Sequence, residues 1–127
     1  MKTMLLNSVV RIARLQGLAK ILDLSRVAAS FIGETDTKRL DGFSHAQQLV
    51  EKSLATIEED DSVEAQQIAI EWLDAAYGEL ESASKSAAEG QSFRSMLVHR
   101  QCEVILTAIT KLLIAWRHDL LNARGEL

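Results

Sequence analysis

The sequence contains no proline, so it lacks the residue that most strongly interrupts helices. Aromatic residues make up only 5% of the 127 residues, and a core must therefore be built mainly from aliphatic side chains and alanine. The frequent Ala, Leu, Glu, Gln and Lys residues favour helix, whereas strands favour β-branched and aromatic residues. These features predict an all-α protein.

Only one cysteine is present, Cys102, and this excludes an internal disulfide. The absence of disulfides fits a reducing cytosol, and a small buried thiol is the expected role of this side chain. No window of 18 residues is free of charge, and no secretory signal is evident at the start. We therefore expect a cytoplasmic protein with no membrane partner. Its length predicts a single domain spanning residues 1–127.

The formal net charge of −4 argues against binding to nucleic acid through overall charge. The charge is unevenly distributed along the chain. Residues 1–32 carry five Lys and Arg residues against Asp23 alone, whereas residues 51–81 are strongly acidic.

The segment Ser92–Asn122 contains neither Gly nor Pro, and its apolar residues recur at helical spacing. Ser92 is a suitable N-cap, and Gly90 separates the segment from what precedes it. Because the apolar arc is wide, we expect this helix to be central and largely surrounded by the others. The central apolar row consists of Val98, Cys102, Ile105, Ile109, Leu112 and Trp116. One flanking row consists of Leu97, Val104, Ala108 and Ala115, and the other of Leu106, Leu113 and Leu120.

A first helix is predicted from about Met4 to Ile32, and its apolar face is wider than one neighbouring helix would cover. Either this helix crosses two others or part of it is buried in an oligomer. Its first row consists of Leu5, Val9, Ile12, Leu15 or Gln16, Ala19, Leu22 and Arg26. Its second row consists of Leu6, Val10, Ala13, Gly17, Ile21, Leu24, Ala28 and Phe31.

The polar segment Gly33–Phe43 is predicted to be a long, mobile connection, with a turn at Asp41-Gly42. Ser44 and Gln47 resemble a capping box, which starts a second helix that ends near Glu59. Asp61 and Glu64 repeat this pattern before a third helix that runs from Ser62 to about Ala88. The sequence therefore predicts an antiparallel four-helix bundle with long first and last helices.

An arginine and a histidine separated by four residues, Arg94 and His99, lie in the segment FRSMLVH (93–99). This segment resembles the signature of the HEPN superfamily, small all-helical domains that often act as ribonucleases in toxin–antitoxin and defence systems. The resemblance implies that Arg94 holds phosphate, that His99 is the acid or base, and that two copies face each other. The other interpretation is a first-turn arginine and a histidine at the edge of a polar stripe.

A second candidate site is the acidic third helix, where paired carboxylates could hold Mg²⁺ for a nucleotide hydrolase. A matching Glu-x-x-Glu segment on another helix is absent, so the solvated face of an amphipathic helix is the alternative. The carboxylates concerned are Glu64, Glu71, Asp74 and Glu81, preceded by Glu58, Glu59, Asp60 and Asp61.

Two further patterns are poor candidates for a DNA-binding or metal-binding site. Leu18–Val27 superficially resembles a helix-turn-helix, but Asp23 occupies the turn position and helical periodicity continues through it. His45 and His118 have no second ligand at metal spacing, and we expect no metal site and no cofactor.

The sequence therefore favours protein–protein interaction or assembly by a small helical bundle that serves as an adaptor, regulator or defence accessory. A homo-oligomer, most simply a dimer, is the expected form, and a protein partner is compatible with it. A HEPN-like, metal-independent ribonuclease acting on RNA is the alternative. A metal-dependent nucleotide hydrolase is the third possibility, and whether the protein is an enzyme is left open.

Overall fold

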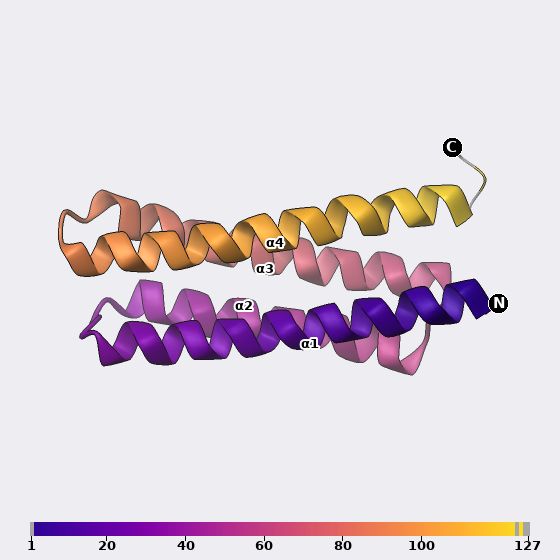
Figure 1. Ribbon diagram of the computed structural model, residues 1–127, viewed down its shortest axis with the longest axis horizontal. Helices are drawn as coiled ribbons and strands as arrows, with labels where there is room; N and C mark the ends of the chain where they lie inside the picture. Colours follow the sequence, from indigo (N-terminus) through magenta and orange to yellow (C-terminus); the bar gives the residue numbers. More distant parts are fainter. Residues whose placement is uncertain (1, 124, 126–127) are drawn as a thin grey trace.

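The computed structural model describes residues 2–123 and 125, with side chains from Ser8 onward. Within this part of the chain there are four helices and no strand, which confirms the predicted all-α, antiparallel four-helix bundle (Figure 1). None of the helices described is long and apolar enough to cross a membrane. The helices are α1 (Lys2–Phe31), α2 (Thr37–Glu59), α3 (Val63–Glu89) and α4 (Phe93–Ala123).

The four helices form two layers, with α1 and α4 in front of α2 and α3 (Figure 1). Helices α2 and α3 share the most extensive packing, and among neighbouring helices α1 and α4 share the least. The prediction that the last helix is central is therefore wrong. Its row of Val104, Ala108 and Ala115 is exposed, because α1 lies too far from α4 to cover it.

The start of α2 also differs from the prediction. Asp36 caps the helix by accepting hydrogen bonds from the backbone N–H groups of Lys38 and Arg39, so the connection from α1 is short. Gly42, predicted to lie in a turn, is buried within α2, where a Cβ atom would lie 2.5 Å from Cβ of Ala83. The glycine therefore allows α2 and α3 to approach closely, and Ser44 is an interior helical residue.

The other helix ends agree better with the sequence. Ser62 is the N-cap of α3, with its hydroxyl accepting from the N–H of Ala65, so Asp61 is not the capping residue. Gly90 ends α3 as predicted. The Ser92 hydroxyl accepts from the N–H of Ser95 and caps α4.

The core is mainly aliphatic, and the predicted row of α4 from Val98 to Trp116 is fully confirmed as buried. The indole Nε1 of Trp116 donates to Oε1 of Gln66 in α3 at 3.0 Å, so the buried N–H is satisfied. In α1 the first predicted row is confirmed in part, since Leu15 and Leu22 are buried whereas Val9 is exposed, and no described residue of the second predicted row is buried. The buried row also takes in neighbouring positions. It consists of Ser8, Arg11, Leu15, Leu18, Leu22 and Ala29; the side chains of Leu5 and Leu6 lie outside the described residues.

Candidate functional site

The most distinctive surface lies along the boundary between α1 and α4, which we call the α1–α4 seam. Thirteen large hydrophobic side chains are exposed in the described part of the chain, and twelve belong to α1, to the residue after it or to α4. Only Ile68, in α3, lies elsewhere. The twelve are Val9, Val10, Ile21, Leu24, Val27, Phe31, Ile32, Phe93, Met96, Val104, Ile114 and Leu121. Met96 and Leu121 lie on the side of α4 that borders α3, so not all twelve line the seam.

A groove of about 410 Å³ runs along the middle of the seam. Its floor and walls are apolar, and one basic side chain from each helix, Arg14 and Lys111, lines it as well. No Cβ atom added at Gly17 would meet another atom within 4 Å, so the space beside this glycine is open. The apolar lining consists of Gly17, Leu18, Ile21, Ala108 and Leu112.

At one end of the seam, α1 and α4 are joined by an ion pair between a buried guanidinium and a half-exposed carboxylate. Nη2 of Arg11 donates to Oδ2 of Asp119 at 2.6 Å, and the guanidinium lies 5.5 Å from the centre of the Trp116 ring. Burial lowers the pKa of Arg11, and the negative charge of Asp119 partly offsets this effect. The charge of Arg11 is thus held in a poorly solvated place by one carboxylate and one aromatic face.

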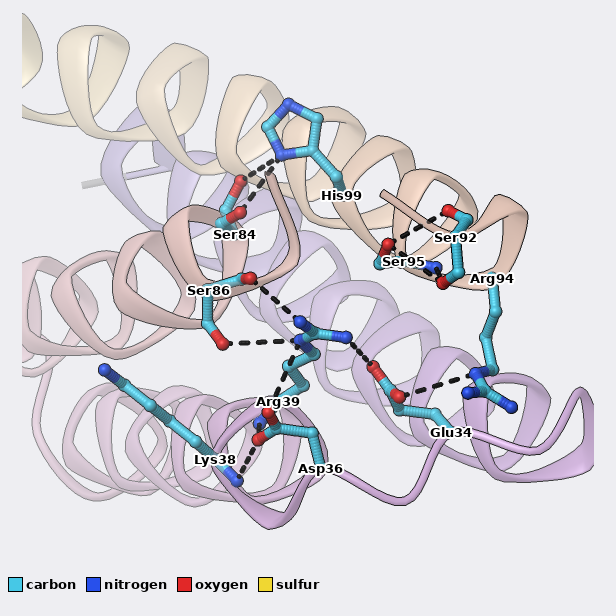
Figure 2. A network of polar contacts seen from close by, with 10 residues as sticks. All are labelled: Glu34, Asp36, Lys38, Arg39, Ser84, Ser86, Ser92, Arg94, Ser95 and His99. Carbon is cyan, nitrogen blue, oxygen red and sulfur yellow. Dashed lines mark hydrogen bonds and ion pairs between the residues drawn. The ribbon is translucent and has the colours of Figure 1, made fainter. Parts of the chain in front are cut away.

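At the opposite end, the carboxylate of Glu34 connects three segments of the chain (Figure 2). Its side chain is only 2% exposed. Nη1 of Arg39 donates to it at 2.8 Å, and Nε of Arg94 lies 3.7 Å from its other oxygen. Arg39 also donates to the backbone carbonyl of Ser86 at 2.9 Å. The α1–α2 connection, the start of α2 and the start of α4 are therefore held together by one buried carboxylate, and Arg39 links them to the end of α3.

His99 lies at the same end of the bundle but contacts different residues. Its Nδ1 is 3.0 Å from the hydroxyl and 3.1 Å from the backbone carbonyl of Ser84 in α3, and its Nε2 is 2.6 Å from Oε1 of Glu103. In Figure 2 its ring lies beside Ser84, whereas the guanidinium of Arg94 extends toward Glu34. Within one chain, Arg94 and His99 therefore contact different residues. A ribonuclease site that contains both side chains stays a prediction.

The two layers carry opposite charge. Helices α1 and α4 together contain nine Lys and Arg residues against three Asp and Glu residues, a net charge of +6. Helices α2 and α3 contain four against ten, a net charge of −6. The exposed apolar side chains and the positive charge therefore lie on the same layer of the bundle.

The acidic face of α3 has partners in the bundle. Asp74 accepts a hydrogen bond from Arg117 of α4, and Glu81 lies 4.0 Å from Nζ of Lys85. A cation at Asp74 would have to displace the guanidinium. No group of three or more His, Cys, Asp or Glu side chains in the described ranges is arranged to hold a metal ion. The segment Leu18–Val27, which resembles a helix-turn-helix, lies within uninterrupted α1.

No family model matches this chain, and no curated protein or solved structure is significantly similar to it. We therefore infer its function from its own residues. Sequence reasoning missed the ion pairs of Arg11 and Glu34, since each joins residues whose proximity depends on how the helices pack. The one available signal was a basic residue, Arg11, at a helical position in register with buried leucines.

Proposed function

We propose that this protein acts by protein–protein interaction, as an adaptor, regulator or defence accessory, and that the α1–α4 seam is its binding surface. The observation that supports this most directly is the concentration of exposed apolar side chains on one layer. Twelve of the thirteen large ones described lie there, and the side chain of Phe31 is 90% exposed. Concentrations of large exposed apolar side chains mark binding sites in soluble proteins.

The ends of the seam support the same proposal. Ion pairs at Arg11 and Glu34 fix the relative position of α1 and α4 at both ends, while the groove between the two pairs stays open. A binding surface held in place before the partner arrives loses less conformational entropy on binding. A second copy is the partner expected from the sequence, and a dimer is the simplest such assembly.

The test uses the tagged chain in extracts of the cells from which it comes. Native size-exclusion chromatography should show a particle larger than the 14.1 kDa monomer. Leu24→Ser together with Val104→Ser should return the protein to monomer size, because both side chains are exposed on the seam. Ile68→Ser, on the opposite layer, is the matched control and should leave the larger particle intact.

The proposal fails if the unaltered chain elutes as a monomer both in extracts and when purified at high concentration. It also fails if the seam variant and the Ile68→Ser control behave alike. Circular dichroism checks that each variant keeps its helical content. Exposed apolar residues contribute little to folding stability, so the variants should fold.

A HEPN-like ribonuclease is the alternative function, supported by the residue pattern and by two partly exposed side chains, Arg94 and His99, near the same end of α4. RNA cleavage that persists in EDTA and disappears in His99→Ala would support it. Arg94→Ala also removes the contact with Glu34, so Arg94→Lys is needed to separate phosphate binding from stability. Absence of cleavage by the unaltered protein, or equal cleavage by the variants, would contradict it.

A further inference from the structure

We propose that the α1–α4 seam binds an acidic amphipathic helix supplied by a different protein. This inference rests on the proposed function and specifies its partner: a helix with an apolar stripe and carboxylates on both sides of that stripe. The helix would lie along the groove, with its apolar side chains between α1 and α4 and its carboxylates at Arg14 and Lys111.

The shape of the groove favours a helix. Two antiparallel helices border it, and their facing residues, among them Gly17, Ile21 and Ala108, are apolar. The apolar rows continue beyond the groove to Leu24 and Phe31 in α1 and to Val104 in α4. An amphipathic helix binds such grooves through residues spaced three and four apart, so a binding helix of about 20 residues would span about 30 Å. Gly17 has no side chain and Ala108 has only a methyl group, so both leave room for larger side chains from the partner.

The charge of the seam favours an acidic partner. Arg14 and Lys111 line the groove from opposite sides, and the two helices together carry a net charge of +6. Carboxylates beside an apolar stripe would meet Arg14 and Lys111 at the rim, where charge complementarity accelerates association and selects the partner.

The same charges argue against a second copy of this chain as the occupant. Joining two identical seams would bring together two layers that each carry a net charge of +6. Placing the seam against the acidic layer of another copy would match the charges. That layer offers Ile68 as its one exposed large hydrophobic side chain within the described residues, so the groove would stay unfilled. An anionic membrane would match the charge, but a flat surface does not fill a groove.

The experiment measures binding of the full chain to synthetic helices by fluorescence anisotropy. The first probe is a labelled peptide of about 20 residues with leucine at every third and fourth position and glutamate elsewhere. A second peptide replaces each glutamate with lysine, and a third keeps the composition of the first in scrambled order. Phosphatidylglycerol vesicles test a membrane surface, and sedimentation velocity tests self-association.

We expect the acidic peptide to bind more tightly than the lysine and scrambled peptides, with an affinity that falls as salt rises. Arg14→Glu with Lys111→Glu should weaken binding on the order of tenfold, whereas Lys38→Glu with Lys85→Glu, on the other layer, should not. Ile21→Ser should weaken it, and Ile68→Ser should not. These isoleucines are matched, because their exposed fractions are 48% and 49%.

The inference is overturned if the lysine peptide binds as well as the acidic one, or if the two isoleucine variants bind equally. It is also overturned if vesicles bind and the peptide does not, or if a dimer forms that Ile21→Ser dissociates and the acidic peptide does not. In the last case the proposed function stands while the inference about its partner fails. A chain that is monomeric in extracts and binds none of the probes contradicts both.

Discussion

Arg11 in α1 and Asp119 in α4 are 108 positions apart in the sequence, yet their side chains form a hydrogen-bonded ion pair of 2.6 Å. The pair is asymmetric in burial: the side chain of Arg11 is 7% exposed, whereas that of Asp119 is 47% exposed. The pair crosses the interface at which the bundle has its sparsest helix packing. Closure of this end of the α1–α4 seam therefore depends on a charge contact more than on apolar packing.

Removal of the Asp119 carboxylate should destabilise the protein. In Asp119→Asn the guanidinium of Arg11 stays near Trp116 without its counter-charge. Because Asp119 is half-exposed and water can partly replace it, we expect a loss of about 1–2 kcal/mol rather than the larger cost of breaking a fully buried pair. Urea unfolding measures this loss. Arg11→Met should be less damaging, since it removes the buried charge and retains an apolar stem; equal stability of Asp119→Asn and the unaltered protein would contradict the prediction.

The buried carboxylate of Glu34 should matter more than a surface one. Glu34→Gln removes the charge that Arg39 and Arg94 contact, and we expect a loss of about 1–3 kcal/mol. Glu58→Gln makes the same chemical change at an exposed position and should have an effect within about 0.5 kcal/mol. Hydrogen exchange should also show faster opening of the first turns of α2 and α4 in Glu34→Gln. Equal unfolding midpoints for the two variants would show that the network does not stabilise the fold.

Two glycines in helices should respond oppositely to alanine. Gly42→Ala places a methyl group 2.5 Å from Cβ of Ala83, so α2 and α3 must move apart, at a cost of about 1–3 kcal/mol. Gly78→Ala, in α3, has no atom within 4 Å of the new methyl group and should stabilise the protein by up to about 1 kcal/mol. Thermal unfolding monitored by circular dichroism measures both. Two shifts of the same sign would disprove the role assigned to Gly42.

Burial raises the pKa of the Cys102 thiol to about 12, from an ordinary value of 9.0. Between these two values the unfolded chain loses the thiol proton and the folded chain keeps it, so this group makes the free energy of unfolding fall as pH rises through that range. The slope is about 1.4 kcal/mol per pH unit at most. Cys102→Ala should remove this part of the pH dependence, as measured by urea unfolding in alkaline buffers.

The same burial predicts a slow thiol reaction. At pH 8, Cys102 should react with a disulfide reagent only when the protein opens, so added urea should accelerate the reaction. Fast labelling of the folded protein without denaturant would show that the side chain is accessible.

The helices themselves were largely predictable from the sequence. The absence of proline and the helical spacing of apolar residues in Ser92–Asn122 indicated α4 to within one residue at each end. Gly90, which separates α3 from α4, was also read correctly as a terminator, since capping is a local property of the chain. The polar run after α1 was misread as a loop, because Asp41-Gly42 carries a turn signal that packing against Ala83 overrides.

What only the tertiary structure decided is which apolar rows are covered. Val98 and Val104 have the same chemistry and lie on one helix, but the first is fully buried and the second is 70% exposed. The position of a residue along its helix sets the direction in which its side chain points, whereas its burial depends on where the other three helices lie. The same holds for the contacts of Arg11 and Glu34, which exist only after distant segments meet. The sequence alone thus determined the helices and showed that they carry more apolar residues than a core of four helices can bury. The packing of α1 against α4 decided that some of these residues line an open, positively charged seam.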